Sequence, residues 1–179
     1  MYKNDFGDQL SRSINSEDSE LFSDRDVGDR QPQLRRLQTF RAGALLFGIH
    51  DDQVAATAEW RRPTPLPHAP PAVLGIVCIH GRMWTVLDPL QLLSDTVNQN
   101  ERSWNFIVAL RGDEQLALAI EDNTGAIEIP ASDLESTSAT AGGAVAAVLR
   151  LPDRVINVIE VKELFPTAMR GRERRRRRF

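Results

Sequence analysis

The sequence is poor in the residues that build disulfides and metal sites. It contains one cysteine, Cys78, and three histidines, His50, His68 and His80, and none of them belongs to a His-x-x-x-His or Cys-x-x-Cys pattern. A lone cysteine cannot form an intrachain disulfide, and a metal centre needs several ligands at short spacing. We therefore expect no metal and no cofactor. Cys78 lies in the apolar run GIVCI, where we expect a small buried hydrophobe.

Long apolar runs are also missing. No stretch approaches the roughly 18 apolar residues that span a bilayer, and the opening MYKNDFGDQL lacks the apolar segment of a secretion signal. We expect a cytoplasmic protein. Apolar residues still make up 41% of the 179 residues, which is enough to build the core of one ordinary domain or two small ones.

The near-neutral total charge hides an uneven distribution. Residues 37–169 contain 16 acidic and 9 basic residues, a net charge of −7, whereas residues 170–179 contain seven arginines and one glutamate, a net charge of +6. Residues 1–36 are rich in Ser, Asp, Asn and Gln without apolar periodicity, so they cannot bury enough surface to offset the entropy of ordering. We predict disordered tails on both sides of one folded region.

The folded region contains an internal repeat. Residues 73–93 align without a gap to residues 145–165 at a spacing of 72, and Asp88 is matched by Glu160. The identical pairs are Val73 and Val145, Arg82 and Arg154, Val86 and Val158, and Leu92 and Leu164. An ungapped match of this length indicates a duplicated module.

A second match supports the duplication. The segment LLFGIHDDQVA from Leu45 aligns with LALAIEDNTGA from Leu116, in the same order along the chain. We therefore divide the folded region into two copies, at about 37–100 and 101–169. The copies either pack side by side or are interleaved by strand exchange.

The apolar pattern between the tails predicts short strands joined by turns. The expected strands are 37–49, 54–60, 74–79, 83–87, 105–110, 115–120, 126–129, 145–151 and 155–159. The turn His50–Gln53 reads as a hairpin connection, while five prolines between residues 63 and 71 exclude helix from the next connection. Short helical segments are expected after Asp88, whose carboxylate can cap them, and at Val161–Phe165.

Strands this short at regular spacing favour an all-β fold over an α/β sheet, which would need long helical crossovers. Two small barrels or one sandwich fit the pattern. A barrel of this size buries few side chains alone, so we expect the two copies to pack together and share a core. Residues 131–143 are expected to form a polar, flexible connection.

Two further sets of residues carry expectations about exposure. Trp84, in the apolar strand MWTVL, is expected to be buried, whereas Trp60, beside two arginines, is the better candidate for an exposed interface anchor. The paired acids Asp51-Asp52 and Glu121-Asp122 fall at equivalent places in the two copies. We therefore read them as a repeated surface turn and not as a general acid and base, which need unlike environments.

Five segments follow one another in a recognisable order: FRAGALLFGI, VAATAEWRRPTPLPHAP, VLGIVCIHGRMWTVLDPLQLL, FIVALRGDEQLALAIED and VLRLPDRVINVIEVKELF. Their most specific features are Glu59-Trp60 before Pro65-Leu66-Pro67, Gly75 before an apolar run, the basic-Gly step His80-Gly81, and Val86-Leu87-Asp88 before Leu90. In this order, over residues 37–165, the chain resembles the CheW-like coupling proteins of bacterial chemotaxis. The resemblance implies two five-stranded SH3-like β-barrels packed together, with a short C-terminal helix.

The resemblance also implies an adaptor and not an enzyme. Members of this family bridge the regulatory domain of a chemotaxis histidine kinase to the cytoplasmic tip of a transmembrane chemoreceptor, which places them at receptor arrays on the inner face of the membrane. Apolar patches at strand edges and between barrels suit a helical hairpin tip. The matching positions, which would form the partner-binding surface, are Glu59, Trp60, Gly75, His80, Gly81 and Arg82.

One of these positions departs from the family pattern. Most members have Asn-Leu-Arg-Gly where this chain has Cys78-Ile79-His80-Gly81, so an imidazole replaces a permanently charged guanidinium. Either the partner lacks the carboxylate that an arginine would match, or Arg82 supplies the charge, or the receptor contact has decayed. We rank a changed partner first; the simpler alternative is a tolerated turn residue.

The arginine-rich tail supports functions of another class. Its basic residues are Arg170, Arg172, Arg174, Arg175, Arg176, Arg177 and Arg178. Such a run can bind nucleic-acid phosphates, anionic lipid headgroups or the acidic body of the same chain, and a solvated tail without a ligand is the simplest reading. A divergent CheW-like scaffold in another signalling system is a further alternative, because fold does not fix partner.

Overall fold

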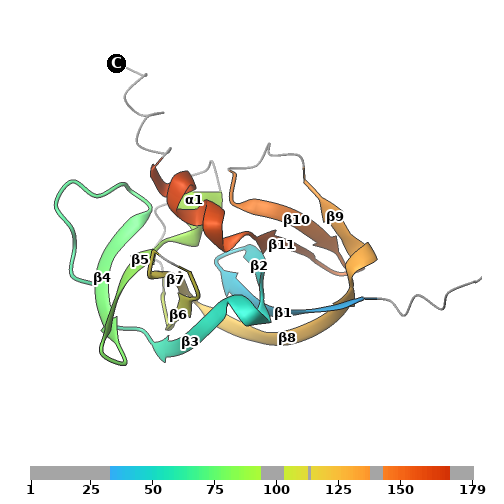
Figure 1. The fold of residues 1–179 in the computed structure, drawn as a ribbon, viewed down its shortest axis with the longest axis horizontal. Helices are drawn as coiled ribbons and strands as arrows, with labels where there is room; N and C mark the ends of the chain where they lie inside the picture. The colour runs from blue at the N-terminus through green and yellow to red at the C-terminus, as the bar shows by residue number, and fades with distance from the viewer. Residues whose placement is uncertain (1–32, 94–102, 113, 138–142, 170–179) are drawn as a thin grey trace, which may run out of the picture. The chain divides into compact units, whose positions relative to one another are not determined.

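The computed structural model describes residues 33–93, 103–112, 114–137 and 143–169, which form two β-sheets and several short helical segments (Figure 1). The fold is all-β with a short C-terminal helix, as predicted. The predicted tail at 170–179 and residues 1–32 of the predicted tail at 1–36 lie outside the described residues. The first strand begins at Leu34, so the folded part starts before the predicted boundary at residue 37.

The larger sheet has six strands in the order β8-β1-β2-β11-β10-β9. These are β1 (Leu34–Ala42), β2 (Leu45–His50), β8 (Asp122–Pro130), β9 (Leu134–Ser136), β10 (Val145–Arg150) and β11 (Val155–Ile159). The resemblance implied five strands in each barrel. The additional strand is β9, which pairs with β10 inside the segment that was expected to be a flexible connection.

The smaller sheet has five strands in the order β3-β6-β7-β5-β4. These are β3 (Val54–Glu59), β4 (Val73–Ile79), β5 (Arg82–Leu87), β6 (Phe106–Leu110) and β7 (Leu116–Ile120). Its two edges meet where Thr64, just after β3, forms an antiparallel bridge with Ile76 in β4. The helical segments are η1 (Asp51–Gln53), α1 (Pro89–Leu93), η2 (Ala131–Asp133), η3 (Val161–Glu163) and the helix at 164–169.

Each sheet takes strands from both copies of the repeat. In the larger sheet, β1 and β2 from the first copy pair with β8 and β11 from the second. In the smaller sheet, β6 and β7 from the second copy pair with β3 and β5 from the first. The hairpin predicted across His50–Gln53 is therefore wrong, because β2 and β3 belong to different sheets.

The chain crosses between the sheets at two places, and the paired acids mark both. The first crossing is η1, where Asp51 accepts a 2.6 Å hydrogen bond from Gln38 Nε2. The second lies between β7 and β8, where Arg41 contacts Glu121 at 3.0 Å and Asp122 at 3.5 Å. These acids hold the crossings in place. The turn predicted at residues 121–125 is shorter than expected, since β8 already begins at Asp122.

The repeat is also visible in the backbone hydrogen bonds. The amide of Asp88 donates to the carbonyl of Ala72 at 2.8 Å, and the amide of Glu160 donates to that of Ala144 at 2.9 Å. β4 and β10 both carry a register shift near their first residue. Since these features share the spacing of 72 found in the sequence, the two copies have the same local structure.

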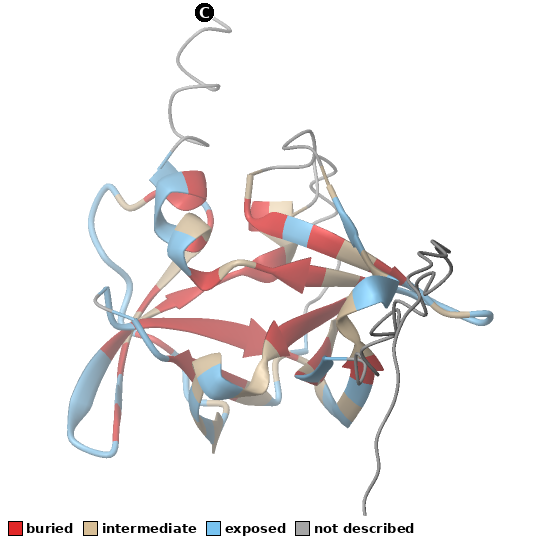
Figure 2. Cartoon of the chain, turned by 45° about the vertical axis from the view of Figure 1, so that its right-hand side comes forward, coloured by how far each residue is buried: buried red, intermediate tan, exposed pale blue. Residues whose placement is uncertain are grey.

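Buried side chains form three clusters. One is enclosed by the strands of the smaller sheet, one is enclosed by the strands of the larger sheet, and the third, called the shared cluster, lies between the two sheets. β7 shows how a single strand serves two of them: Leu116, Leu118 and Ile120 face the shared cluster, while Ala117 and Ala119 face the interior of the smaller sheet. Figure 2 shows buried strands through the centre of the molecule. Each sheet, with its interior cluster, is called here the five-stranded or the six-stranded barrel.

Several local predictions are confirmed. The β4–β5 and β6–β7 hairpins form; Asp88 Oδ1 accepts a 2.9 Å hydrogen bond from the amide of Leu90 at the start of α1; and Trp84 is only 7% exposed. The prediction for Cys78 is wrong, because its thiol is exposed. Side chains alternate across a strand, and in β4 the inward positions belong to Val77 and Ile79.

Candidate partner-binding surface

The β4–β5 turn is a two-residue loop that places its side chains outside the barrel. Ile79 pairs with Arg82, and both intervening residues have positive φ, 49° at His80 and 77° at Gly81. Two successive positive φ angles give the turn a twist that matches the flanking strands. Histidine is among the few non-glycine residues found in this region with any frequency. His80, Gly81 and Arg82 are all exposed.

Glu59 and Trp60 lie where β3 ends. Glu59 pairs with Phe106 in the ladder and its side chain is exposed. The Trp60 amide donates a 2.9 Å hydrogen bond to the carbonyl of Asn105, and its ring lies 6.3 Å from that of Trp104 at an angle of 45°. Trp60 is half-buried against the interior cluster, so part of its surface remains accessible.

Gly75 is buried, and its geometry serves a contact within the chain. Its φ is +140°, and an added Cβ would lie 2.2 Å from the carbonyl oxygen of Thr64. Only glycine therefore allows Thr64 to exchange hydrogen bonds of 2.8 and 2.9 Å with Ile76. The backbone that approaches Gly75 closely is that of Thr64 in the same chain. A role for Gly75 in binding a partner stays a prediction.

The Thr64 bridge brings the end of β3 toward the β4–β5 turn. The bridge is antiparallel, so residues that precede Thr64 run toward the Ile79 end of β4. Trp60 accordingly packs against the cluster that contains Ile79 and Trp84. In Figure 1 the end of β3 lies near the β4–β5 turn at the lower left. Five of the six predicted residues therefore belong to one end of the five-stranded barrel.

Neighbouring residues that the sequence reasoning missed extend this surface. Met83 is 56% exposed, and Cys78, its partner across the hairpin, is exposed as well. The outward position of Met83 follows from the burial of Trp84 next to it, since neighbours in a strand face opposite sides. The residues from here on called the hairpin surface are Glu59, Trp60, Arg61, Arg62, Cys78, His80, Gly81, Arg82 and Met83.

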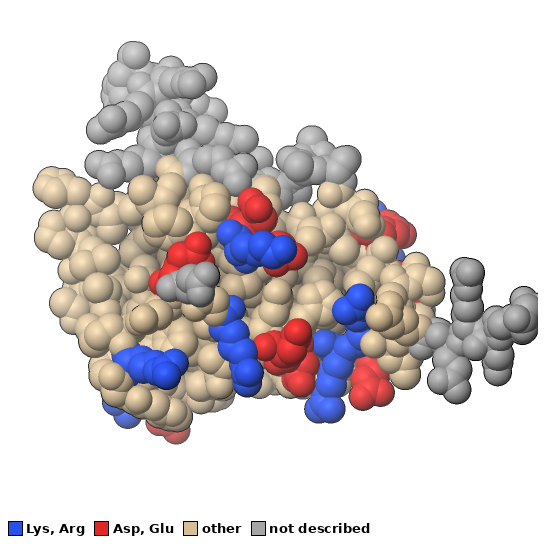
Figure 3. All heavy atoms as spheres, in the orientation of Figure 1, with Lys and Arg blue, Asp and Glu red and all other residues tan. Residues whose placement is uncertain are grey.

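Three arginines give the hairpin surface its charge. Arg61, Arg62 and Arg82 are exposed, and within the described residues none of them forms a salt bridge, in contrast to Arg41 and Arg150. Figure 3 shows basic side chains at the lower left, over the end of the molecule that carries the β4–β5 turn. Cations without an internal partner can pair with carboxylates of another protein.

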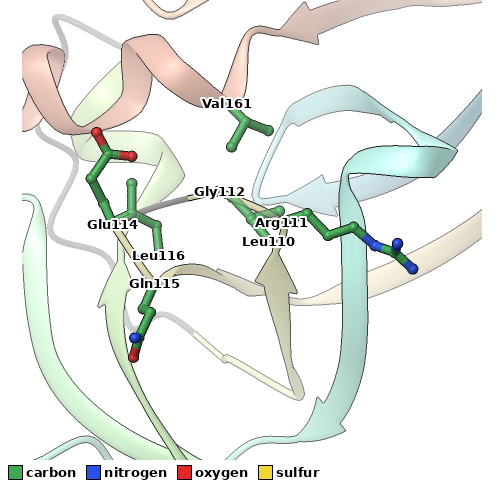
Figure 4. Close-up of a pocket in the computed structure, with 7 residues that line it drawn as sticks. All are labelled: Leu110, Arg111, Gly112, Glu114, Gln115, Leu116 and Val161. Atoms are coloured by element: carbon green, nitrogen blue, oxygen red, sulfur yellow. The ribbon is translucent and has the colours of Figure 1, made fainter.

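A separate depression lies between the β6–β7 turn and η3. Figure 4 shows its lining residues, with Arg111 and Glu114 pointing away from each other. The residues are Leu110, Arg111, Gly112, Glu114, Gln115, Leu116 and Val161. Its volume of about 130 Å³ is well below the roughly 300 Å³ at which small-molecule sites begin. The depression is too shallow to enclose a ligand of that kind.

Within the described residues, no group of three or more His, Cys, Asp or Glu side chains could hold a metal ion, and no helix has the length and apolar content to cross a bilayer. The arginine-rich tail, with Arg172 and Arg174–Arg178, lies outside the described residues.

Comparison with known proteins supports the resemblance read from the sequence. A family model described as the CheW-like domain matches residues 36–169, which is most of the chain. The chain belongs to the CheW-like domain family. It is 25% identical over 140 residues to the chemotaxis protein CheW of Rhizobium meliloti (strain 1021), across 76% of this chain and 90% of that protein.

The fold of this CheW-like chain is similar to a solved structure of the family. The crystal structure of the scaffolding protein TtCheW from Thermoanaerobacter tengcongensis matches with a TM-score of 0.63 at 17% sequence identity, covering 74% of this chain and 88% of that one. The predicted CheW-like fold is confirmed. With the family match, these similarities make the chain a CheW-like scaffold of the chemotaxis type.

Proposed function

We propose that this CheW-like protein couples the regulatory domain of a chemotaxis histidine kinase to the cytoplasmic tip of a chemoreceptor, in the cytoplasm at receptor arrays. The observation that carries the proposal is the hairpin surface, where exposed arginines stand beside an exposed methionine and a half-buried tryptophan. The partner is recognised by surface complementarity, and no covalent bond is made or broken. The proposal therefore assigns no catalytic residue.

The chemistry of the hairpin surface fits an amphipathic helical partner. Met83 and the accessible part of Trp60 offer apolar contact area, and tryptophan is among the residues that most often dominate binding energy. Arg61 and Arg62, which follow Trp60, and Arg82, which precedes Met83, are exposed and add positive charge. A helix with an apolar stripe flanked by carboxylates would satisfy both features.

The repeat supplies a matched control for testing this surface. Arg82 and Arg154 are aligned in the two copies and both are exposed; Arg82 begins β5, and Arg154 immediately precedes β11. We expect Arg82→Glu to weaken binding of a purified receptor-tip fragment about tenfold or more, since a like charge replaces an attractive one. Arg154→Glu should change affinity by less than about twofold. Titration calorimetry at constant salt measures both.

A result that contradicts the proposal is equally defined. If both variants weaken binding to the same extent, the effect comes from net charge and the hairpin surface is not the receptor site. If wild-type protein binds neither the organism's chemoreceptor tips nor its kinase regulatory domain, the chain is a CheW-like scaffold of another signalling system.

His80 is proposed to set which receptor is accepted. Arginine at this position would add a planar, permanently charged donor group beside Arg82, so we expect His80→Arg to change affinity for the cognate receptor fragment about fivefold or more. His80→Asn is the control for the turn, because asparagine also tolerates positive φ and removes only the imidazole. Unchanged affinity in His80→Arg, with a correctly folded protein, would show that this position does not discriminate partners.

A further inference from the structure

The ring of Trp60, the aromatic side chain of the hairpin surface, has a second tryptophan beside it. Trp104 precedes β6, and its ring lies 6.3 Å from that of Trp60 at an interplanar angle of 45°. A tilted pair at this distance is a favourable aromatic arrangement. Trp104 is half-buried as well. Each ring therefore restricts the orientations that are open to the other.

The backbone next to Trp104 is held by hydrogen bonds in two directions. The amide of Trp60 donates to the carbonyl of Asn105 at 2.9 Å, and the amide of Asn105 donates to the carbonyl of Ile120 at 3.0 Å. The side-chain amide of Asn105 donates to the carbonyl of Glu121 at 2.8 Å. Because Asn105 adjoins Trp104, these bonds fix the backbone that carries the Trp104 ring to the end of β3 on one side and to the end of β7 on the other.

Trp104 also packs against the interior of the molecule at two places. It contacts the cluster inside the five-stranded barrel, which contains Ile79 and Trp84, and it contacts the shared cluster between the sheets. Protein interiors are close-packed, so a ring held against two clusters has little freedom to move. Trp60 packs against the first of these clusters and is followed by the exposed Arg61. Trp104 is therefore the more firmly held of the two rings.

The orientation of Trp60 matters for binding because a large side chain that can take several rotamers loses that freedom when a partner binds. The loss lowers the affinity, and a side chain that is already held in its bound orientation avoids it. Residues that do not touch the partner can supply this support by packing against the side chain that does. Trp104 lies where such support is needed.

We propose that Trp104 is a positioning residue for receptor binding: it holds the ring of Trp60 in the orientation that the receptor tip accepts, and it does not contact the receptor. This inference rests on the proposed function, since it needs a receptor that binds at the hairpin surface. It adds a residue that lies outside that surface. The alternatives are direct contact between Trp104 and the receptor, and a role in stability alone.

The experiment is a double-mutant cycle on the affinity of the full chain for a purified receptor-tip fragment. Titration calorimetry compares Trp60→Leu, Trp104→Leu and the double variant at a temperature where all of them are folded. We expect Trp60→Leu to weaken binding about tenfold and Trp104→Leu about fivefold. The double variant should bind within about twofold of Trp60→Leu, because Trp104 acts through Trp60.

Conservative variants complete the cycle. Trp104→Phe keeps an aromatic ring beside Trp60, so its affinity should lie within about twofold of the wild type. If Trp104→Leu does not fold, Trp104→Met takes its place in the cycle, because the flexible methionine side chain adapts to irregular space.

A second aromatic pair in the chain provides the matched control for stability. The rings of Phe40 and Phe47 lie 5.7 Å apart at 40° in the shared cluster. Phe47→Leu removes this pair and should lower the melting temperature, but it should leave receptor affinity within about twofold of the wild type. Melting curves of all variants show whether affinity simply follows stability. A loss of affinity in Trp104→Leu that is absent in Phe47→Leu and absent in the Trp60→Leu background supports the proposal.

Three results overturn the inference while Arg82→Glu still weakens binding and the proposed function stands. One is unchanged affinity in Trp104→Leu. The second is a further loss in the double variant equal to that of Trp104→Leu alone, which means that Trp104 contributes independently of Trp60. The third is an equal loss in Phe47→Leu, which would assign the effect to stability. If the wild-type protein does not bind the receptor tip, the proposed function fails and the inference fails with it.

Discussion

At the scale of single residues, the β4–β5 hairpin contains three residues with positive φ. Gly75, His80 and Gly81 all have positive φ, yet their surroundings differ completely. Gly75 is pressed against the Thr64 carbonyl, whereas an added Cβ at Gly81 would meet nothing within 4 Å. The same residue type therefore serves closure of the barrel at one position and shape of the turn at the other.

We expect Gly75→Ala to lower the free energy of unfolding by about 3 kcal/mol, because a strained φ and a steric clash add together. Gly81→Ala should cost only about 1 kcal/mol, the penalty for an L-residue at left-handed φ in open space. Urea unfolding monitored by tryptophan fluorescence measures both. Similar losses in the two variants would show that Gly75 does not hold the Thr64 bridge.

At the scale of elements, β7 shows why a central strand in this fold cannot alternate polar and apolar residues. It is buried along its full length, with larger side chains toward the shared cluster and alanines toward the narrow barrel interior. β3, at the edge of the same sheet, has alternating half-buried and exposed positions. Strand composition thus follows from how many faces are covered.

We expect Ala119→Leu to destabilise the protein by about 1–3 kcal/mol, since close-packed interiors do not accept extra methylenes without strain. Leu118→Ala, on the opposite face, should cost about 2–5 kcal/mol through the cavity that it leaves. Ala55→Leu, at an exposed position of β3, is the matched control and should change stability by less than about 0.5 kcal/mol. Thermal unfolding of the three variants tests the assignment of faces, and a tolerated Ala119→Leu would contradict it.

Sequence reasoning predicted well those elements whose structure depends on residues close together in the chain. The β4–β5 hairpin follows from its two-residue turn, and the start of α1 from the carboxylate of Asp88. The crossing at His50–Gln53 has a similar turn composition, but pairing partners far along the chain decide that β2 and β3 separate. The residues of the turn alone therefore do not predict that β2 and β3 lie in different sheets.

The candidate surface was predictable to a similar degree. The exposed turn of His80 and Arg82 could be placed from the motif, and Trp60 from its basic neighbours. Cys78 and Met83 were missed because the apolar run was read as wholly buried, whereas only alternate residues of β4 and β5 face the core. A stricter use of the two-residue period around Trp84 would have found both.

At the scale of the whole molecule, the two copies complete each other. Each barrel combines the first two strands of one copy with the remaining strands of the other. Neither copy alone contains all the strands of a barrel, and the largest buried cluster draws on both sheets. The stability of the fold therefore depends on both copies of the repeat being present.

We predict that the halves expressed separately, divided between Leu93 and Ser103, do not fold, and that mixing them restores the native structure as a one-to-one complex. Burial of β6 and β7 against β3 and β5 supplies the driving force. Circular dichroism and size-exclusion chromatography of the fragments, alone and mixed, provide the measurement. A half that unfolds cooperatively on its own would contradict the prediction.

The two crossings between the sheets also couple the opening of one barrel to the opening of the other. Both are short, η1 in one case and Glu121 alone in the other, and both are anchored by contacts to β1. Because the crossings join β2 to β3 and β7 to β8, separation of one of these strands from its barrel displaces a strand of the other barrel. Partial opening of a single barrel is therefore suppressed. Amide protons in β2 and β7 should then exchange with solvent at the same, slowest rate, because they become accessible only when both barrels open together.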